Sequence, residues 1–274
     1  MSFLPRLVLG SSIALLAASS SLAAVFGDDD RIRPQSSQIS AFAPIGVVRP
    51  LSGLGSWALP RYATGFLIDD CHVLTVQHLL GDDTSPVGKR VGFSAGHSTP
   101  NLTTTHGSVV AAGNLQHYSG YSRAQGSKRY EEARAHDWML VRLDQCIGRV
   151  LGHVRLSLSL PGWQVESAGF PLNILDGGLK IDPACRIRYQ TDLLWLNDCA
   201  SAEGNSGSPI FNEIQEGGKT VLQVYGMQTA GWSTNSRTKK FSWYYANVAT
   251  PVSKIIPQIA QFVPLDRKRE LASR

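Results

Sequence analysis

The chain has 274 residues, of which 43% are hydrophobic and 17% are charged. This balance excludes an intrinsically disordered protein and predicts one large domain or two small lobes with an ample core. The formal net charge of +5 is small and spread along the chain, so it does not support nucleic-acid binding.

The first residues have the layout of a secretory signal peptide. Arg6 supplies an early positive charge, residues 7–18 are mostly apolar, and small residues surround a cleavage site after Ala23 or Ala24. A membrane anchor is the weaker interpretation, because the apolar run is short and interrupted by serines. We therefore expect residues 1–24 to be removed, and the mature chain to be secreted or periplasmic with no membrane association.

The mature chain begins with a polar, acidic segment, residues 26–32. Cleavage after Arg31 would free an amino terminus at Ile32, which is one interpretation. An exposed lead-in to the first strand is the other, and the sequence leaves both open.

The composition favours an all-β protein, because 26 glycines and 14 prolines separate short apolar runs. Strands are predicted over residues 45–48, 63–68 and 72–76, the last two joined by the turn residues Asp69 and Asp70. His78 directly follows the third of these strands.

The middle of the chain carries fewer signals. Residues 81–136 are polar and irregular apart from short apolar runs such as 107–112, and residues 116–135 are predicted to be mostly loop. Apolar density returns in a buried strand that opens at Asp137.

A connector over residues 147–160 precedes a second series of elements. Apolar residues at helical spacing predict a C-terminal helix that packs on the body. Two series of strands suit two similar β lobes. The predicted strands cover residues 164–171, 186–191, 221–226 and 241–248, and the predicted helix covers residues 252–262.

Four cysteines form an even set in a chain expected to be exported, so disulfides are favoured over metal ligation. Three pairings are possible; we predict Cys71 with Cys146 and Cys185 with Cys199, because each bridge then lies within one half of the chain. The bridge that closes the shorter loop would contribute ~3 kcal/mol.

Ser206 lies between glycines in the sequence Glu-Gly-Asn-Ser-Gly-Ser-Pro, residues 203–209. Glycine tolerates the backbone angles of a tight turn, and successive N–H groups of such a turn can hold an oxyanion. A nucleophilic serine also needs a histidine to take its proton and an acid to orient that histidine. His78, Asp137 and Ser206 follow one another in an order known for catalytic triads.

Several motifs resemble those of the trypsin/chymotrypsin-like serine peptidases. They are TGFLI at residues 64–68, LTVQH at 74–78, DWML at 137–140 and GNSGSP at 204–209. The acidic lead-in and AGFP at residues 168–171 further resemble the bacterial glutamyl-endopeptidase-like branch. The likeness covers roughly residues 26–262 in motif order.

This resemblance implies an all-β fold of two antiparallel six-stranded barrels with the triad in the cleft between them. The first barrel would span residues 25–150 and the second residues 151–251, followed by a C-terminal helix and tail, 252–274.

The resemblance also implies the roles of the site residues. His78 would take the proton of Ser206, Asp137 would fix the tautomer of His78, and the N–H groups of Gly204 and Ser206 would form the oxyanion hole. Asn205 stands where common members have an aspartate that pairs with a freed amino terminus, which argues against activation at Ile32.

Two further departures lie beside the histidine. Val76 and Gln77 occupy positions where the family commonly has two small residues, and no cysteine follows His78.

The substrate pocket implied by the resemblance has Ala200 and Ser201 at its base and Gln228, Thr229 and Gly231 on one wall. No acid occupies the base, so a preference for Arg or Lys is not supported. Gln228 stands where the glutamate-specific branch has a histidine, so a preference for Glu is not supported either.

The remaining histidines are predicted to be loop or surface residues without the regular spacing of a metal site. They are His72, His97, His106, His117, His136 and His153. Trp138 is predicted to be a core residue. Asn101 begins a glycosylation sequon in form only, which a bacterial source would leave unused.

The sequence therefore predicts a secreted, monomeric serine endopeptidase that hydrolyses polypeptides through an acyl-enzyme on Ser206, with no cofactor and no metal. One alternative is a catalytically silent trypsin-like binding protein. Another is an esterase or acyl hydrolase on a different scaffold, against which the missing Gly-x-Ser-x-Gly elbow argues.

Overall fold

The computed structural model describes residues 24–51, 62–81, 85–96, 103–115, 128–159, 161–172, 178–231, 240–243 and 245–263. Most of the predicted signal peptide and the sequon at Asn101 lie outside these ranges. Within them, none of the helices has the length and hydropathy needed to cross a membrane.

Six antiparallel strands form a first closed barrel in the order β1-β2-β3-β6-β5-β4, with β1 also paired to β4. Alternate side chains of β4 face the core, among them Val91 and Phe93, as expected when one face of a strand is buried. The strands are β1 (Ile45–Pro50), β2 (Ala63–Leu67), β3 (His72–Thr75), β4 (Arg90–Ala95), β5 (Thr103–Ala112) and β6 (Met139–Leu143).

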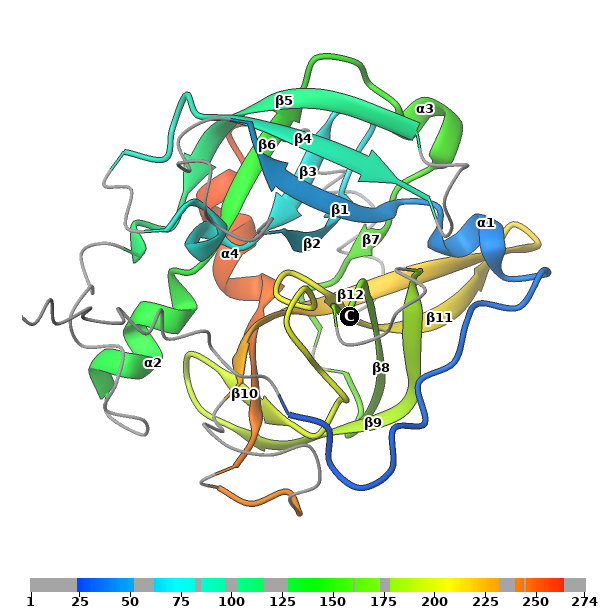
Figure 1. Ribbon diagram of the computed structural model, residues 1–274, viewed down its shortest axis with the longest axis vertical. Helices are drawn as coiled ribbons and strands as arrows, with labels where there is room; N and C mark the ends of the chain where they lie inside the picture. The colour runs from blue at the N-terminus through cyan, green and yellow to red at the C-terminus, as the bar shows by residue number, and fades with distance from the viewer. Residues whose placement is uncertain are drawn as a thin grey trace, which may run out of the picture.

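Six further strands form a second barrel, which closes because β11 pairs with both β8 and β12. The two barrels lie side by side in Figure 1, the first above the second. The strands are β8 (Gln164–Gly169), β9 (Lys180–Gln190), β10 (Trp195–Asn197), β11 (Pro209–Glu216), β12 (Lys219–Gly231) and β13 (Asn247–Pro251), and the short β7 (Arg155–Leu156) pairs in parallel with β12.

The prediction of an all-β fold of two six-stranded barrels is confirmed. The strands predicted in the first third of the chain agree with β1 to β3 within two residues at each end. The strand predicted over residues 241–248 was wrong in its first half, where Ser242 and Tyr245 form only an isolated bridge and β13 begins at Asn247.

The segment predicted to be polar and irregular contains β4 and a helix, α2 (Lys128–Ala135). Five of the eight residues of α2 are charged, so no apolar stripe marks it as a helix. Its Tyr130 and Ala135 instead pack with Leu196, Ala230 and Val248 of the second barrel. Tertiary packing therefore stabilises a helix that the local pattern does not signal.

Three shorter helical turns complete the connections. They are α1 (Ile39–Phe42) before β1, η1 (Gln77–Leu80) after β3 and α3 (Gly148–Leu151) in the predicted connector.

The predicted C-terminal helix is present as α4 (Val252–Ile259). Val252, Ile255, Ile256 and Ile259 are buried in the main core, whereas Phe262 lies beyond the helix and is 37% exposed.

Both predicted disulfides are confirmed. Cys71 is bonded to Cys146, and Cys185 is bonded to Cys199. Each bridge joins segments of one barrel.

The acidic lead-in is closely bound to the second barrel. The guanidinium of Arg31 pairs with both carboxylate oxygens of Asp29 at 2.7 and 2.6 Å, and its side chain is 1% exposed. Ile32 exchanges two backbone hydrogen bonds with Ile181 of β9. These contacts hold Arg31 and Ile32 in place, while the side chain of Ile32 stays 43% exposed.

Candidate active site

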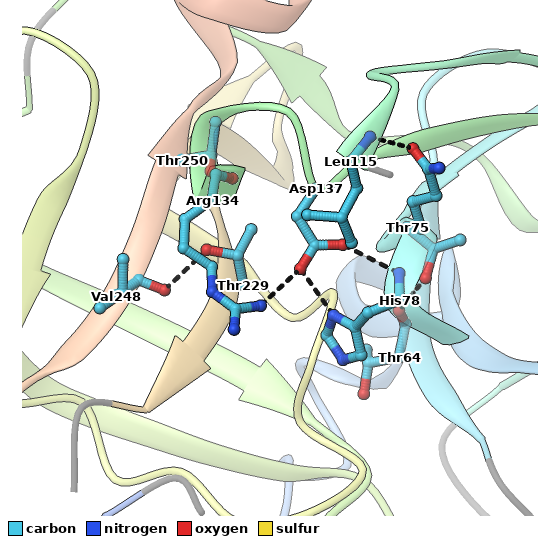
Figure 2. Close-up of polar contacts among 10 residues, drawn as sticks. Thr64, Thr75, His78, Leu115, Arg134, Asp137, Thr229, Val248 and Thr250 are labelled. Atoms are coloured by element: carbon cyan, nitrogen blue, oxygen red, sulfur yellow. Dashed lines mark hydrogen bonds and ion pairs between the residues drawn. The ribbon is translucent and has the colours of Figure 1, made fainter. Parts of the chain in front are cut away.

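The pairing of β3 with β6 brings His78 and Asp137 together. Thr75 at the end of β3 lies opposite Met139 at the start of β6. His78 follows Thr75 by three residues and Asp137 precedes Met139 by two, so both reach the same end of the first barrel. The turn η1 then directs the imidazole toward the carboxylate (Figure 2).

Asp137 binds His78 through both oxygens. The backbone N–H of His78 donates to Oδ1 at 2.9 Å, and the imidazole Nδ1 lies 2.6 Å from Oδ2. Asp137 is completely buried, while the side chain of His78 is 29% exposed. This arrangement places the Nδ1 proton between ring and carboxylate and leaves Nε2 as the nitrogen able to accept a proton.

A third donor reaches the same carboxylate. Arg134 Nη1 lies 3.2 Å from Asp137 Oδ2. Burial by itself would raise the pKa of Asp137, but the charge and hydrogen bonds of His78, together with the charge of Arg134, outweigh burial and hold this pKa below its usual value. Asp137 is therefore ionised at neutral pH.

The turn that carries Ser206 depends on two glycines. Gly204 has φ +94° and Gly207 has φ +88°, a region that other residues rarely adopt. A Cβ on Gly207 would also collide with the carbonyl oxygen of Thr64, and one on Gly204 with that of Phe170. Glycine is thus required on both sides of the serine.

The Ser206 turn belongs to the second barrel but is hydrogen-bonded to the first. Thr64 of β2 donates its N–H to Ser206 O and its hydroxyl to Gly204 O, both at 2.8 Å. The carbonyl of Thr64 accepts the hydroxyl of Thr75 at 2.7 Å, three residues before His78. The structure therefore brings the Ser206 turn to the end of the barrel that holds His78 and Asp137.

Ser206 itself is half-buried, and it makes no hydrogen bond to His78 in this structure. Such contacts are often long in free enzymes and tighten only when substrate binds.

Two N–H groups of the turn lack a partner among the described residues. The N–H groups of Asn205, Gly207 and Ser208 donate to carbonyl oxygens of Ala202, Gln228 and Asn205, respectively. No such bond engages the N–H groups of Gly204 and Ser206, the two predicted to form the oxyanion hole. They remain available to a substrate oxygen.

The predicted pocket residues Ala200, Ser201, Gln228 and Thr229 are all at most 5% exposed. Gln228 Oε1 accepts a hydrogen bond from Asn197 Nδ2 at 3.2 Å, and Thr229 donates to a backbone carbonyl on β13. Gly231 ends β12 and pairs with β13. Their polar groups are largely satisfied within the barrel, except for the buried hydroxyl of Ser201, which has no described partner.

Two residues around the pocket were not predicted. Asp182 Oδ2 accepts the N–H of Ala200 at 2.6 Å, and Asn247 binds the backbone of Ala24 and Cys199. No local pattern marks them, because each acts on a segment that is distant in sequence. Arg134 was also missed, although its position one helical turn before Asp137 could have indicated it.

One histidine was wrongly assigned to the surface. His72 is 8% exposed and its Nδ1 lies 2.8 Å from Asp69 Oδ2. Asp69 also accepts the N–H groups of Cys71 and His72, so this pair stabilises the β2–β3 turn.

A hollow of about 1340 Å³ lies between the first barrel and the C-terminal end, lined by His72, Arg142, Leu156 and Phe262 among others. None of the predicted catalytic, oxyanion-hole or substrate-pocket residues lines it. Over the described part of the chain, no group of three or more His, Cys, Asp or Glu side chains is placed to bind a metal ion.

Comparison with known proteins gives structural relatives only. No protein-family model matches the chain, and no curated protein matches it in sequence. A solved structure described as a Glu endopeptidase in complex with MPD superposes with a TM-score of 0.58 at 16% identity, covering 87% of this chain and 98% of the other. The chain has the trypsin-like serine protease fold. At this identity the likeness shows the trypsin-like fold alone, and any activity has to be argued from the residues.

Proposed function

We propose that this trypsin-like chain is a serine endopeptidase with His78, Asp137 and Ser206 as its catalytic triad. The observation that carries the proposal is the 2.6 Å contact between His78 and a buried Asp137, at the barrel end to which the Ser206 turn is hydrogen-bonded.

In the proposed reaction, His78 Nε2 takes the proton of Ser206 as Oγ attacks the carbonyl of a peptide bond. Asp137 holds the tautomer and stabilises the imidazolium that forms. The N–H groups of Gly204 and Ser206 stabilise the oxyanion, and His78 then gives its proton to the leaving amine. Water activated by His78 hydrolyses the acyl-enzyme and restores Ser206.

Export from the cytoplasm is part of the proposal. Two disulfides are typical of chains that fold in an oxidising compartment. Together with the predicted signal peptide, they support a secreted or periplasmic location.

The proposed substrate pocket carries no charged side chain at Ala200, Ser201, Gln228, Thr229 or Gly231. Gln228 is held by Asn197 and is itself uncharged. We therefore expect no strong preference for an acidic or a basic residue before the scissile bond, although the structural relative is described as a Glu endopeptidase. Cleavage of a peptide library would measure this preference.

The competing function is that of a silent binding protein of the same fold, which the absent His78–Ser206 hydrogen bond favours. A fluorophosphonate probe separates the two, because only an activated serine attacks its phosphorus, displaces fluoride and becomes phosphonylated. The mature wild-type protein should be labelled, and Ser206→Ala should not. Ser208→Ala is the matched control, since it removes a fully buried hydroxyl of the same turn and should still label. Absence of labelling in folded wild-type protein would overturn the enzyme proposal.

A further inference from the structure

Arg134 is an unusual neighbour for the carboxylate of Asp137. It lies near the end of α2 with a side chain only 13% exposed, and its Nη1 is 3.2 Å from Asp137 Oδ2. That oxygen also binds His78 Nδ1 (Figure 2). Two potentially cationic groups therefore share one carboxylate oxygen.

Arg134 is held from both barrels. Its guanidinium lies 5.2 Å from the ring centroid of Tyr130, four residues earlier on α2, a distance at which a cation and a ring attract. Its carbonyl oxygen accepts the hydroxyl of Thr250 on β13 at 2.9 Å. The backbone of Arg134 is thus anchored to the second barrel, while its side chain binds the carboxylate of Asp137.

The guanidinium stays charged in this site. Burial would lower the pKa of Arg134, but interactions with Tyr130 and Asp137 outweigh burial and raise it above its usual value. Arg134 Nε has no partner among the described residues. A buried charge with one unsatisfied donor is costly to maintain, which indicates a role beyond surface solvation.

We propose that Arg134 is a positioning residue that acts on His78 through Asp137: it fixes Oδ2 and withdraws part of its negative charge from the imidazole. The consequence for catalysis rests on the proposed function, but the effect on His78 does not require turnover.

The physical consequence concerns protonation of His78. A carboxylate shared with a guanidinium attracts an imidazolium less strongly than an unshared one, because the two cations repel each other. Removal of the Arg134 charge should therefore favour the protonated imidazole of His78.

No other titratable group offers an alternative source for this effect within the described contacts. The charges that act on Asp137 are those of His78 on η1 and Arg134 on α2, and Tyr130 faces Arg134 from the same helix. Among the residues drawn in Figure 2, those from β2, β3, β12 and β13 include the non-titrating Thr64, Thr75, Thr229 and Thr250.

The test compares Arg134→Met, which removes the charge, with Arg134→Lys, which keeps it. Lys128→Met is the matched control, since it removes one positive charge from an exposed position of the same helix. Two pH titrations are recorded for each protein: the rate at which a fluorophosphonate phosphonylates Ser206, and the ¹⁵N signals of the His78 ring.

In Arg134→Met, both midpoints should move to higher pH by about one unit, because the imidazolium is then favoured. The lysine variant and the Lys128→Met control should titrate as wild type does. Unchanged midpoints in a folded Arg134→Met protein would overturn the proposal and reduce Arg134 to a structural ion pair.

If Arg134→Met does not fold, Arg134→Gln replaces it in the comparison with Arg134→Lys, and equal midpoints in that pair would overturn the proposal. Failure of the enzyme proposal is recognised separately, since wild type would then not react with the probe while its His78 signals still titrate.

Discussion

The two carboxylate oxygens of Asp137 accept hydrogen bonds from three donors, so a substitution of Asp137 removes more than one interaction. His78 takes one bond to each oxygen, and Arg134 shares Oδ2. Loss of the carboxylate charge therefore affects two partners: the imidazole loses its orienting acid, and the buried guanidinium loses its counter-ion.

Asp137→Asn should lower kcat by roughly 10⁴-fold, because an amide favours the wrong tautomer of His78. It should also destabilise the fold by roughly 3 kcal/mol, because Arg134 is left buried without an anion. Urea unfolding and peptide hydrolysis measure the two effects.

The double variant Asp137→Asn/Arg134→Met is the control for this prediction. It should recover most of the stability and none of the activity. Equal stability of the single variant and wild type would show that the Arg134–Asp137 pair contributes nothing net to the fold.

At the scale of elements, neighbouring strands bring like charges together as well as opposite ones. Glu166 of β8 lies on the strand paired with β11, which carries Glu213. Burial, followed by repulsion from Glu213, raises the pKa of Glu166 to about 7. Gln38 donates a hydrogen bond to Glu213 at 2.9 Å and satisfies one of its oxygens.

The raised pKa predicts a fold that loses stability as pH rises. The native state holds the Glu166 proton more tightly than the unfolded chain does. The stabilisation of the native state by this proton is therefore fully present below about pH 4.5 and is lost as pH rises through about 7. Because Glu166 is half-buried, we expect a loss of roughly 1 kcal/mol after screening. Glu166→Gln should remove this loss in unfolding experiments between pH 5 and 8, whereas the exposed Asp192→Asn should not. A Glu166→Gln curve parallel to that of wild type would contradict the assignment.

For the whole molecule, the candidate site exists only where the two barrels meet. The base and its acid come from the first barrel, and the serine turn comes from the second. Thr64 bonds the turn to the first barrel, and Tyr130 packs α2 into a cluster of the second. The disulfides stay within single barrels, so they constrain each lobe rather than the interface.

The two bridges should differ in their contribution to the free energy of unfolding. They span 75 and 14 residues, which in the chain-entropy description correspond to about 4.5 and about 3 kcal/mol. Paired Cys→Ala variants of each bridge, unfolded in urea, measure the difference. A larger loss for Cys185–Cys199 would show that native packing around these two buried residues, rather than loop length, sets the stability.

The sequence alone predicted four of the six strands of the first barrel (β1, β2, β3 and β6), the α4 helix and both cysteine pairs. Alternation of apolar residues and turn-forming residues at strand ends are local signals, so they can be recognised without a structure. The same holds for the glycines around Ser206, whose positive φ angles the backbone requires.

Only the tertiary structure determined α2, the burial of Arg134 and the setting of the pocket by Asn197 and Asn247. In each of these cases, residues far away in sequence bury a polar or charged segment. The second barrel, for example, buries one face of α2. The sequence therefore determined which side chains can form the proposed catalytic triad, namely His78, Asp137 and Ser206. The packing of one barrel against the other determined that a guanidinium shares the carboxylate oxygen bound by His78, because that contact depends on the distant residues that hold Arg134 in place.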